Sequence, residues 1–474
     1  MKVLSLFASF LAAEASYAAV LGDVSLQKRA SVSGTAVVKL DTSTGSSQHL
    51  ASGFIYGIPD TQGQIPDHFY TDIGFNFGRS GGAQIPSRGW LGGVNEYIPR
   101  FNSTLANYRT SRKFGARFNV LVHDLWGADT TQPSSAPYPG DNGDWSSFDA
   151  FLTRLISDMK SNNMIAGVIL DIWNEPDLEV FWNRSEAQWI QMWGRAFHHF
   201  KRDFPAVGTS GPSLSASPST GNTWWTNWAT FVAQNKSIPT QYAWHMETGG
   251  GDMQEAVSTY KTILSQRGLA TDAPININEY AVYDEQVPSG AAWWISQLER
   301  VNAIGLRGNW LLNGSLHDFM AGLLGKPNAG TPSYDEHAGG YYPAAEFQVY
   351  KYYAQNMNGF RVQTIPTADK NGEVYAVVDN DRVRLLAGTR IATGTWEIKL
   401  SKLTSIGLPP SGSLKIHTYK FEGSTDHFAR YDQSTDLGMY EHTYSNDELT
   451  FPIWSNEPIT ALAFEFSRTT GSSV

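Results

Sequence analysis

The sequence contains no cysteine, little charge and no cluster of basic residues. Asp, Glu, Lys and Arg make up only 17% of its 474 residues. Without cysteine there can be no disulfide, no thiolate nucleophile, no Cys-ligated zinc and no iron–sulfur cluster. The 45 acidic and 35 basic residues give a formal net charge of −10. An acidic chain without a basic block argues against nucleic acid or an anionic membrane as a partner.

One short, mostly apolar segment stands out, and it lies at the N-terminus. The run Val3–Ala13 follows a lysine and precedes a group of small residues, which is the pattern of a secretory signal peptide. A membrane-spanning helix needs about 20 apolar residues, so this run is too short to be one. We predict a signal peptide over residues 1–19, a pro-segment over 20–29 that ends at Lys28-Arg29, and a secreted, extracellular protein. Four N-x-[ST] sequons are compatible with secretion and glycosylation: Asn102, Asn183, Asn235 and Asn313.

Aromatic residues, by contrast, are plentiful. They make up 13% of the chain and include 16 Trp, and the hydrophobic share of 41% excludes a largely disordered protein. The length suits one large domain and a smaller one. Aromatic side chains mostly fill cores, but with so few charges they also suit flat platforms for an uncharged polar ligand such as a sugar.

The region from about residue 51 to 355 alternates short apolar runs with longer helical patterns. For example, apolar residues recur at helical spacing from Phe148 to Met159. Such alternation is typical of βα units, and eight strands in about 300 residues match a (β/α)₈ barrel. We therefore predict an α/β fold with a (β/α)₈ TIM barrel over 51–355. The eight predicted strands are Gly53–Ile58, Asp72–Arg79, Ala116–His123, Gly167–Trp173, Ala206–Gly211, Gln241–His245, Ile275–Tyr280 and Leu306–Asn313.

After the barrel the pattern changes to short β-type runs separated by Gly, Pro, Asn and Asp. No strong helix intervenes, so residues 356–474 are predicted to form an all-β sandwich domain. The segment Gly34–Leu40 has the same character, and we expect residues 30–50 to add a strand to that sandwich. The predicted sandwich strands are Val374–Val378, Val383–Leu386, Trp396–Leu400, Leu414–Tyr419 and Ile459–Phe466.

Two glutamates follow predicted barrel strands at the end where such barrels carry their active sites. Glu175 lies in Asp171-Ile-Trp-Asn-Glu-Pro-Asp177 after the fourth strand, and Glu279 lies in Ile277-Asn-Glu-Tyr280 at the seventh. Closure of the barrel would bring both to one rim. Cleavage of a glycosidic bond needs such a pair, one carboxyl group protonated and the other ionised. Other polar or aromatic residues at strand ends are Arg79, His123, Asn174, His245 and Trp310.

The run from Asp171 to Trp182, with the sequence DIWNEPDLEVFW, resembles the acid/base segment of glycoside hydrolase family 39. That family belongs to a large clan of retaining (β/α)₈ glycosidases and includes β-xylosidases and α-L-iduronidases. Members of the clan carry Asn-Glu after the fourth strand and the nucleophilic Glu at the seventh. The barrel order and the trailing β-sandwich also fit, so the resemblance covers nearly all of the mature chain.

The resemblance implies a role for each matching residue. Glu175 would be the general acid/base and Glu279 the nucleophile, while Asn174 would hold the 2-hydroxyl group of the sugar. Arg79 matches the strand-two arginine of the clan. Its guanidinium would keep Glu279 ionised, because a nearby cation lowers the pKa of a carboxyl group.

Three further residues match less closely. Trp310 would lie under the sugar ring at the cleavage subsite, unless it is an ordinary core aromatic. His245 and His123 are candidate partners for sugar hydroxyl or carboxylate groups, although a histidine in an apolar strand is as often a core residue. The segments Val122-His-Asp-Leu-Trp126 and Trp244-His-Met-Glu-Thr248 follow the family pattern only loosely, which leaves the sugar open.

The implied function is a secreted retaining glycoside hydrolase that needs no cofactor and has no metal site. The first-choice activity, on family frequency, is that of a β-xylosidase-like exo-glycosidase acting on polysaccharide fragments. The alternatives are an endo-acting enzyme or one that acts on uronosyl, arabinosyl or galactosyl linkages, and an inactive carbohydrate-binding protein. The expected partner is an oligo- or polysaccharide, not nucleic acid or a membrane, and the sequence does not give the oligomeric state.

Overall fold

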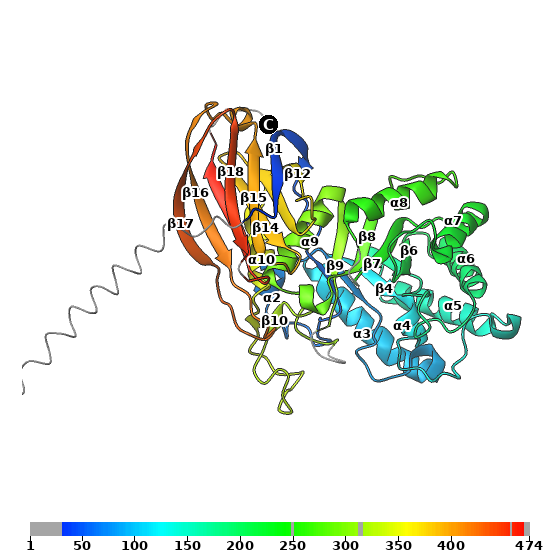
Figure 1. Cartoon of the computed structure of the whole chain (residues 1–474). Coiled ribbons are helices and arrows are strands. Elements are labelled where there is room, and N and C mark those ends of the chain that lie inside the picture. Colours follow the sequence, from blue (N-terminus) through cyan, green and yellow to red (C-terminus); the bar gives the residue numbers. More distant parts are fainter. Residues whose placement is uncertain (1–30, 248–250, 311–315, 456, 469–474) are drawn as a thin grey trace, which may run out of the picture.

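The computed structural model describes residues 31–247, 251–310, 316–455 and 457–468. Eight parallel strands close into a barrel, and a nine-stranded sheet lies beside it (Figure 1). The predicted fold class, a (β/α)₈ barrel with a C-terminal all-β domain, is confirmed. The barrel strands are β2 (Gly53–Ile55), β3 (Phe77–Ser80), β4 (Arg117–Leu121), β5 (Val168–Asp171), β6 (Gly208–Leu214), β7 (Gln241–Met246), β8 (Ile275–Tyr280) and β9 (Ala303–Arg307).

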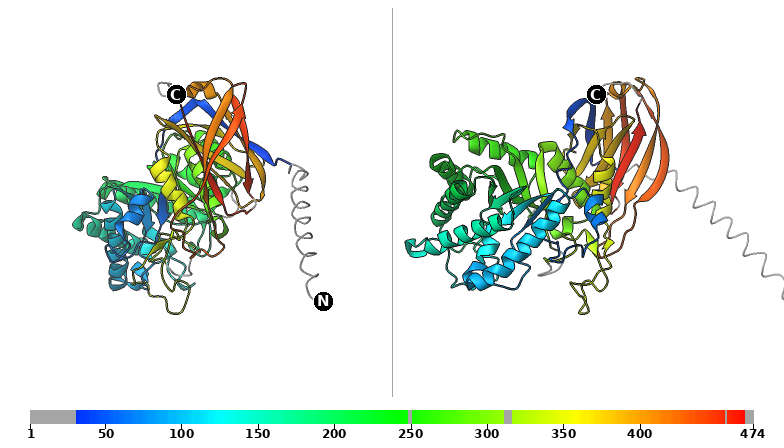
Figure 2. Two further views of the ribbon diagram at one scale, coloured as in Figure 1. Left: turned by 90° about the vertical axis from the view of Figure 1, so that its left-hand side faces the viewer. Right: turned by 180° about the vertical axis from the view of Figure 1, so that it is seen from behind.

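Helices cover the outside of the barrel, as the views in Figures 1 and 2 show. The apolar stripe from Phe148 to Met159 lies in α5 (Ser146–Ser161) and forms its buried face. At the start of α6 (Glu186–Asp203), the Ser185 hydroxyl accepts a hydrogen bond from the Gln188 backbone N–H and caps the helix. The other helices are α2 (Asp67–Asp72), α3 (Val94–Lys113), α4 (Val122–Trp126), α7 (Thr223–Asn235), α8 (Met253–Ser265), α9 (Pro288–Val301) and α10 (Phe347–Asn356).

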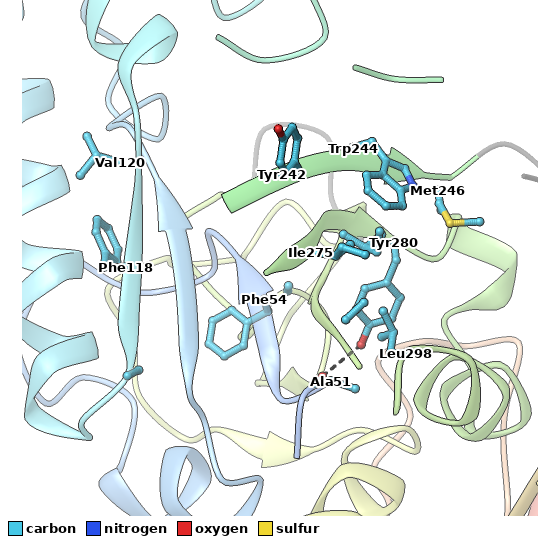
Figure 3. Close-up of a cluster of buried hydrophobic side chains, with 14 of the residues drawn as sticks. Ala51, Phe54, Phe118, Val120, Tyr242, Trp244, Met246, Ile275, Tyr280 and Leu298 are labelled. Carbon is cyan, nitrogen blue, oxygen red and sulfur yellow. Dashed lines mark hydrogen bonds between the residues drawn. The ribbon is translucent and has the colours of Figure 1, made fainter. Parts of the chain in front are cut away.

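Alternation along the barrel strands separates an apolar outer face from a polar inner face. On β7, Tyr242, Trp244 and Met246 belong to the buried apolar cluster drawn in Figure 3. Successive side chains of a strand point to opposite faces, so His245 points into the barrel. On β8, the Tyr280 hydroxyl lies on the outer side and donates a hydrogen bond to the backbone carbonyl of Ala51 (3.2 Å; Figure 3). The packing of the outer face thus fixes which residues face inward.

Strand β1 (Gly34–Ser46) lies within the C-terminal sheet although it precedes the barrel in sequence. It pairs antiparallel with β12 (Phe360–Ile365) and parallel with β15 (Gly394–Ser401). The strand order is β17-β16-β19-β14-β13-β12-β1-β15-β18, and the sheet encloses an apolar core of its own. The remaining strands of the sheet are β13 (Gly372–Val378), β14 (Arg382–Thr389), β16 (Gly412–Phe421), β17 (Thr435–Tyr444), β18 (Glu448–Ser455) and β19 (Ala461–Ser467).

Helix α9 joins the barrel to this sheet. The Ser289 hydroxyl accepts a hydrogen bond from the Thr389 backbone N–H (2.8 Å) and donates one to the carbonyl of the same residue (3.0 Å). Arg300 at the end of the helix forms a buried ion pair with Glu373 on β13. Gly388 makes this close approach possible, because a Cβ atom there would lie 2.2 Å from the Ser289 carbonyl oxygen. The two parts of the chain are therefore tightly packed.

Of the eight predicted barrel strands only Ile275–Tyr280 has the observed bounds, and the other seven differ at one or both ends. Three of them show why. β3 begins at Phe77, because Asp72 and the residues before it belong to α2. β4 ends at Leu121, so His123 lies in the short helix α4 and not on a strand. β9 begins and ends earlier than the predicted Leu306–Asn313. In each case the predicted run extends beyond one end of the strand, into a helix or a loop, and apolar runs alone do not separate these states.

Several predictions fall outside the described residues. These are the signal peptide over 1–19, the pro-segment over 20–29 and the sequon at Asn313. Asn102 and Asn183, the acceptor residues of two other sequons, are exposed. In the described ranges, no helix combines the length and the apolar character that crossing a membrane would require.

The contact between α9 and β14 predicts a site where one methyl group destabilises the protein. In Gly388→Ala the new Cβ would lie 2.2 Å from the Ser289 carbonyl oxygen and 2.8 Å from the Ala292 Cβ. Overpacking of this kind typically costs about 1–3 kcal/mol, so we expect a lower melting temperature in a thermal melt. Gly339→Ala is the matched control, because its Cβ meets no atom within 4 Å. Equal melting temperatures for the two variants would contradict the tight contact.

Candidate active site

A cavity of about 450 Å³ lies at the C-terminal ends of the barrel strands. Its volume falls within the range of small-ligand sites. Each of the eight strands, or the loop that follows it, contributes to the wall. In strand order, wall residues are Ile55 and Tyr56, Ala83, Leu121 and His123, Asn174 and Glu175, Ser215, Glu247, Glu279, and Asn309 and Trp310.

Arg79 on β3 lies behind the cavity, is fully buried and binds three acceptors. Its Nε donates to Asp171 Oδ2 (2.9 Å), its Nη2 donates to Asn174 Oδ1 (2.6 Å), and its Nη1 pairs with Glu279. A planar guanidinium that is always charged suits such a fixed set of acceptors. Breaking a buried ion pair by removing one partner costs about 3–5 kcal/mol, so each group holds the others in place.

Arg79 also decides how Asn174 presents its amide group. A guanidinium has only donors, so the amide atom that faces it must be the oxygen. The amide nitrogen Nδ2 then points away from Arg79. Because Asn174 lines the cavity, this nitrogen is available to donate a hydrogen bond to a bound molecule.

Glu175 follows β5 in a backbone conformation that few residues adopt. Its φ angle is 39°, in the left-handed region, which costs a residue other than glycine about 1–3 kcal/mol. Its backbone N–H donates to the carbonyl of Ser213 at the end of β6 (2.8 Å). The Asp177 carboxylate accepts hydrogen bonds from the backbone N–H groups of Ser215 (2.9 Å) and Ala216 (3.2 Å). These contacts with the next strand hold the turn that brings Glu175 into the cavity wall.

The aromatic residues of the same motif support this turn. Trp173 donates its indole N–H to the carbonyl of Phe181 (3.1 Å), and its ring meets Trp182 edge-on at 5.1 Å between ring centres. Phe181 itself lines the cavity and lies 5.7 Å from the ring of His123. The segment that resembles family 39 is thus folded as one packed unit.

His245 on β7 links the two predicted catalytic glutamates. Its Nδ1 lies 2.9 Å from Glu175 Oε1, and its Nε2 lies 3.8 Å from Glu279 Oε1. Burial alone would lower the pKa of the imidazole, but the charge of Glu279 and the hydrogen bond to Glu175 raise it above its ordinary value of 6.5. The ring thus lies between the two carboxyl groups, with Nδ1 at Glu175 and Nε2 facing Glu279.

A third carboxyl group, that of Glu247, adjoins Glu279. Burial opposes the ionisation of Glu279, but the charges of His245 and Arg79 outweigh it and lower the pKa of Glu279 below its usual range. Burial, followed by the negative charge of Glu279, raises the pKa of Glu247 well above its usual range. The two neighbouring carboxyl groups thus have opposite biases, Glu279 towards the ionised form and Glu247 towards the protonated form.

The structure places His123 and Trp310 in the cavity wall. The Nε2 of His123 lies 2.8 Å from Asp124 Oδ1, and both side chains are buried. Trp310 donates its indole N–H to the carbonyl of Ala281 (2.9 Å) and remains 38% exposed. An anchored indole with an open face can pack against the apolar face of a sugar ring.

Sequence reasoning missed several polar residues of the wall, among them Glu247, Tyr56, Asn309 and Asp124. Glu247 had a usable signal, because it lies two residues after His245 and strand alternation puts both on the inner face. Tyr56 and Asn309 also follow barrel strands, but nothing in the sequence singles them out from other loop residues. The Tyr56 hydroxyl donates a hydrogen bond to Asp124 and accepts one from the Gly81 backbone N–H (3.0 Å). These contacts hold the side chains of Tyr56 and Asp124 in the wall.

The side chains of Glu175, His245 and Glu247 also form a candidate metal site. One oxygen of each glutamate and one ring nitrogen lie within 4.8 Å of one another, so the group has ligand types that a cation could use. However, His245 is hydrogen-bonded to Glu175 and Glu247 to Glu279, and these shared protons compete with a cation. The arrangement suits proton transfer.

Comparisons with known proteins support the fold. No family model and no curated protein matches the sequence. Solved structures do match. The structure of N2152 from Neocallimastix frontalis is 18% identical in sequence, with a TM-score of 0.72, and the match covers 92% of this chain and 100% of the N2152 chain. The GH39 enzyme from Xanthomonas axonopodis pv. citri follows at 13% identity and a TM-score of 0.57, covering 94% of this chain and 99% of its own. A monomeric β-xylosidase from Caulobacter crescentus CB15 has 14% identity and a TM-score of 0.54, covering 92% and 100%. The chain therefore has the fold of enzymes that include a member of the family its sequence resembles.

The contacts of His245 predict its titration. Because Glu279 supplies the largest contribution that raises the pKa of His245, we expect this pKa to lie above 6.5 in the wild type and to fall in Glu279→Gln. A raised histidine pKa stabilises the folded state fully below about pH 6.5, and this contribution is lost as the pH rises through the folded-state value. NMR of protein labelled in its histidine rings measures both values. His442, which lies in the β domain, should titrate identically in both proteins, and an unchanged His245 would contradict the linkage.

Proposed function

We propose that the protein is a retaining glycoside hydrolase in which Glu279 is the nucleophile and Glu175 the general acid/base. The observation that carries the proposal is the pair itself: two glutamates on β8 and after β5 line one cavity and approach a single imidazole, that of His245. Arg79 and His245 bias Glu279 towards the ionised form that a nucleophile needs. The fold is one that glycoside hydrolases use, which supports the proposal without assigning a substrate.

The proposed reaction has two steps. In the first, a Glu279 oxygen attacks the anomeric carbon, and Glu175 gives its proton to the departing glycosidic oxygen. In the second, Glu175 takes a proton from water, the water oxygen attacks the anomeric carbon, and the ester bond to Glu279 breaks. Asn174 is placed to donate its amide N–H to a sugar hydroxyl group, and the open face of Trp310 to pack against the ring.

The charges around the cavity favour an uncharged sugar. The described residues that line it include five acidic side chains and neither lysine nor arginine: Asp124, Asp129, Glu175, Glu247 and Glu279. The guanidinium of Arg79, behind the cavity, already binds three protein acceptors. A uronosyl substrate would bring a carboxylate to this wall without a cation to pair with it. We therefore propose a β-xylosidase-like exo-glycosidase acting on neutral oligo- or polysaccharide fragments. Among the alternative substrates, uronosyl linkages are less favoured than arabinosyl or galactosyl linkages or an endo-acting enzyme.

We further propose that the enzyme is secreted. The apolar run, the small residues after it and the sequons support this view. The rival from another class is a carbohydrate-binding protein without activity. A binding protein would have no need to keep one glutamate ionised beside a second that is hydrogen-bonded to His245, so the cluster favours an enzyme.

Turnover of a panel of aryl glycosides and defined oligosaccharides tests the proposal. We expect the wild type to hydrolyse at least one neutral β-glycoside, and Glu279→Gln to lose more than about a thousandfold in kcat/KM, because no glycosyl-enzyme can form. Glu179→Gln, an exposed residue in the same loop as Glu175, is the control and should behave like the wild type. Negligible turnover of the whole panel by the wild type would favour the binding protein.

The role of Glu175 is tested by chemical rescue. Glu175→Ala should still react with aryl β-glycosides that have good leaving groups, because these need no proton, and should then stall at the glycosyl-enzyme. Azide needs no general base, so it should accelerate turnover and leave a β-glycosyl azide. An α-configured azide, or no acceleration, would reject the assignment; NMR of the product distinguishes the two configurations.

A further inference from the structure

Glu247 adds a third carboxyl group to the pair that carries out the proposed reaction. It follows β7 and lines the same cavity as Glu175 and Glu279. One of its oxygens lies within 4.8 Å of an oxygen of Glu175 and of a ring nitrogen of His245. Its Oε1 is buried and accepts no hydrogen bond from the described donors, and the side chain is hydrogen-bonded to Glu279.

Glu279 is buried and Glu247 partly buried, and two carboxyl groups in contact at such a place are not both ionised, so one of them holds a proton. The neighbouring cations decide which one. Arg79 binds Glu279 directly, and His245 faces Glu279 with its Nε2 at 3.8 Å. Neither lysine nor arginine is present among the described residues that line the cavity beside Glu247. The ionised partner is therefore Glu279, and the proton lies on Glu247.

We propose that Glu247 is a positioning residue that acts through Glu279: its protonated carboxyl group donates a hydrogen bond to the Glu279 carboxylate and holds it in place between Arg79 and the substrate. The inference rests on the proposed function, because Glu247 has this task only if Glu279 attacks the sugar. Glu247 itself exchanges no proton with substrate or water.

The donor acts differently in the two steps. When Glu279 bonds to the anomeric carbon, its negative charge is consumed and the hydrogen bond from Glu247 weakens. When the ester breaks, the electron pair of the C–O bond returns to Glu279, and the waiting donor stabilises the carboxylate as it leaves. Hydrogen bonds to charged groups are stronger than those to neutral ones, so Glu247 assists the second step more than the first.

The same contact predicts the pH dependence. The charged and titratable groups that face Glu247 are Glu279 on β8, Glu175 after β5, His245 on β7 and Arg79 on β3. The hydrogen bond from Glu247 is one of the contributions that lower the pKa of Glu279. Removing the donor raises that pKa. Because catalysis needs ionised Glu279, the acid limb of the kcat/KM profile then moves to higher pH.

Two substitutions at position 247 test this role. Glu247→Ala removes the donor. With an aryl glycoside whose good leaving group makes the second step rate-limiting, we expect kcat to fall about 10- to 100-fold, as for loss of a hydrogen bond to a charged group, and the acid limb of kcat/KM to shift to higher pH. Glu247→Gln keeps an N–H donor and should restore both the rate and the position of the limb to near wild-type values. Glu179→Gln is the control for removal of an exposed carboxylate nearby.

Other outcomes would overturn the proposal in recognisable ways. If Glu247→Gln is as inactive as Glu279→Gln, Glu247 takes part in the chemistry itself. If Glu247→Gln moves the acid limb to lower pH, then Glu247 is ionised in the wild type, because removal of a negative charge lowers the pKa of Glu279. If both variants keep the wild-type profile and differ only in melting temperature, the role is structural. Loss of activity on treatment with a chelator would instead indicate a cation among Glu175, His245 and Glu247.

An infrared measurement reads the proton without any substrate. At neutral pH the wild type should show a carbonyl band of a protonated carboxylic acid that is lost in Glu247→Gln and kept in Glu179→Gln. An identical spectrum in Glu247→Gln would place the proton elsewhere. A wild type that shows this band but hydrolyses no glycoside would refute the proposed function and leave the proton on Glu247. If the wild type hydrolyses a glycoside and Glu279→Gln abolishes that activity, but the wild type lacks the band, only the role of Glu247 is refuted.

Discussion

One buried guanidinium orders the reactive end of this barrel. Arg79 on β3 binds Asp171 on β5, Asn174 after it and Glu279 on β8, so a single charge fixes side chains from three strands. The same charge also influences which of the neighbouring carboxyl groups are protonated. Of the carboxyl groups near His245, the one that Arg79 binds is biased towards the ionised form, while Glu247, which Arg79 does not bind, is biased towards the protonated form. Residues of one type thus obtain opposite properties from position alone.

Most of the fold could be predicted because its strands are buried and its helices are amphipathic. The stripe from Phe148 to Met159 is read directly as α5, and all eight barrel strands have counterparts in the structure. Strands that lack these signals were missed. β17 is largely exposed and forms the edge of the sheet in Figure 1, so no apolar alternation marks it. β18 contains Pro452, a residue that argues against a strand when only the sequence is known.

The candidate site was partly accessible from sequence. The motif around Glu175 and the strand order place two glutamates at one rim, and the structure puts both in one cavity wall with Asn174 and Trp310, with Arg79 behind it. His245 was a candidate partner for hydroxyl or carboxylate groups, but its position between Glu175 and Glu279 could not be predicted, because it depends on side chains from three parts of the barrel meeting in space. The protonation of Glu247 could not be predicted from the sequence, because burial and neighbouring charges determine it. A linear pattern contains neither.

The central claim is that Glu279 forms a covalent bond with the sugar while Glu247 only supports it. A 2-deoxy-2-fluoro glycoside with a good leaving group, built on the sugar that the enzyme turns over, slows the second step and lets the glycosyl-enzyme accumulate. Peptide mass spectrometry then locates the label. The account predicts that it lies on Glu279, in the peptide that contains Ile277-Asn-Glu-Tyr280. A label on Glu247 or Glu175, or inactivation without a covalent adduct, would contradict it.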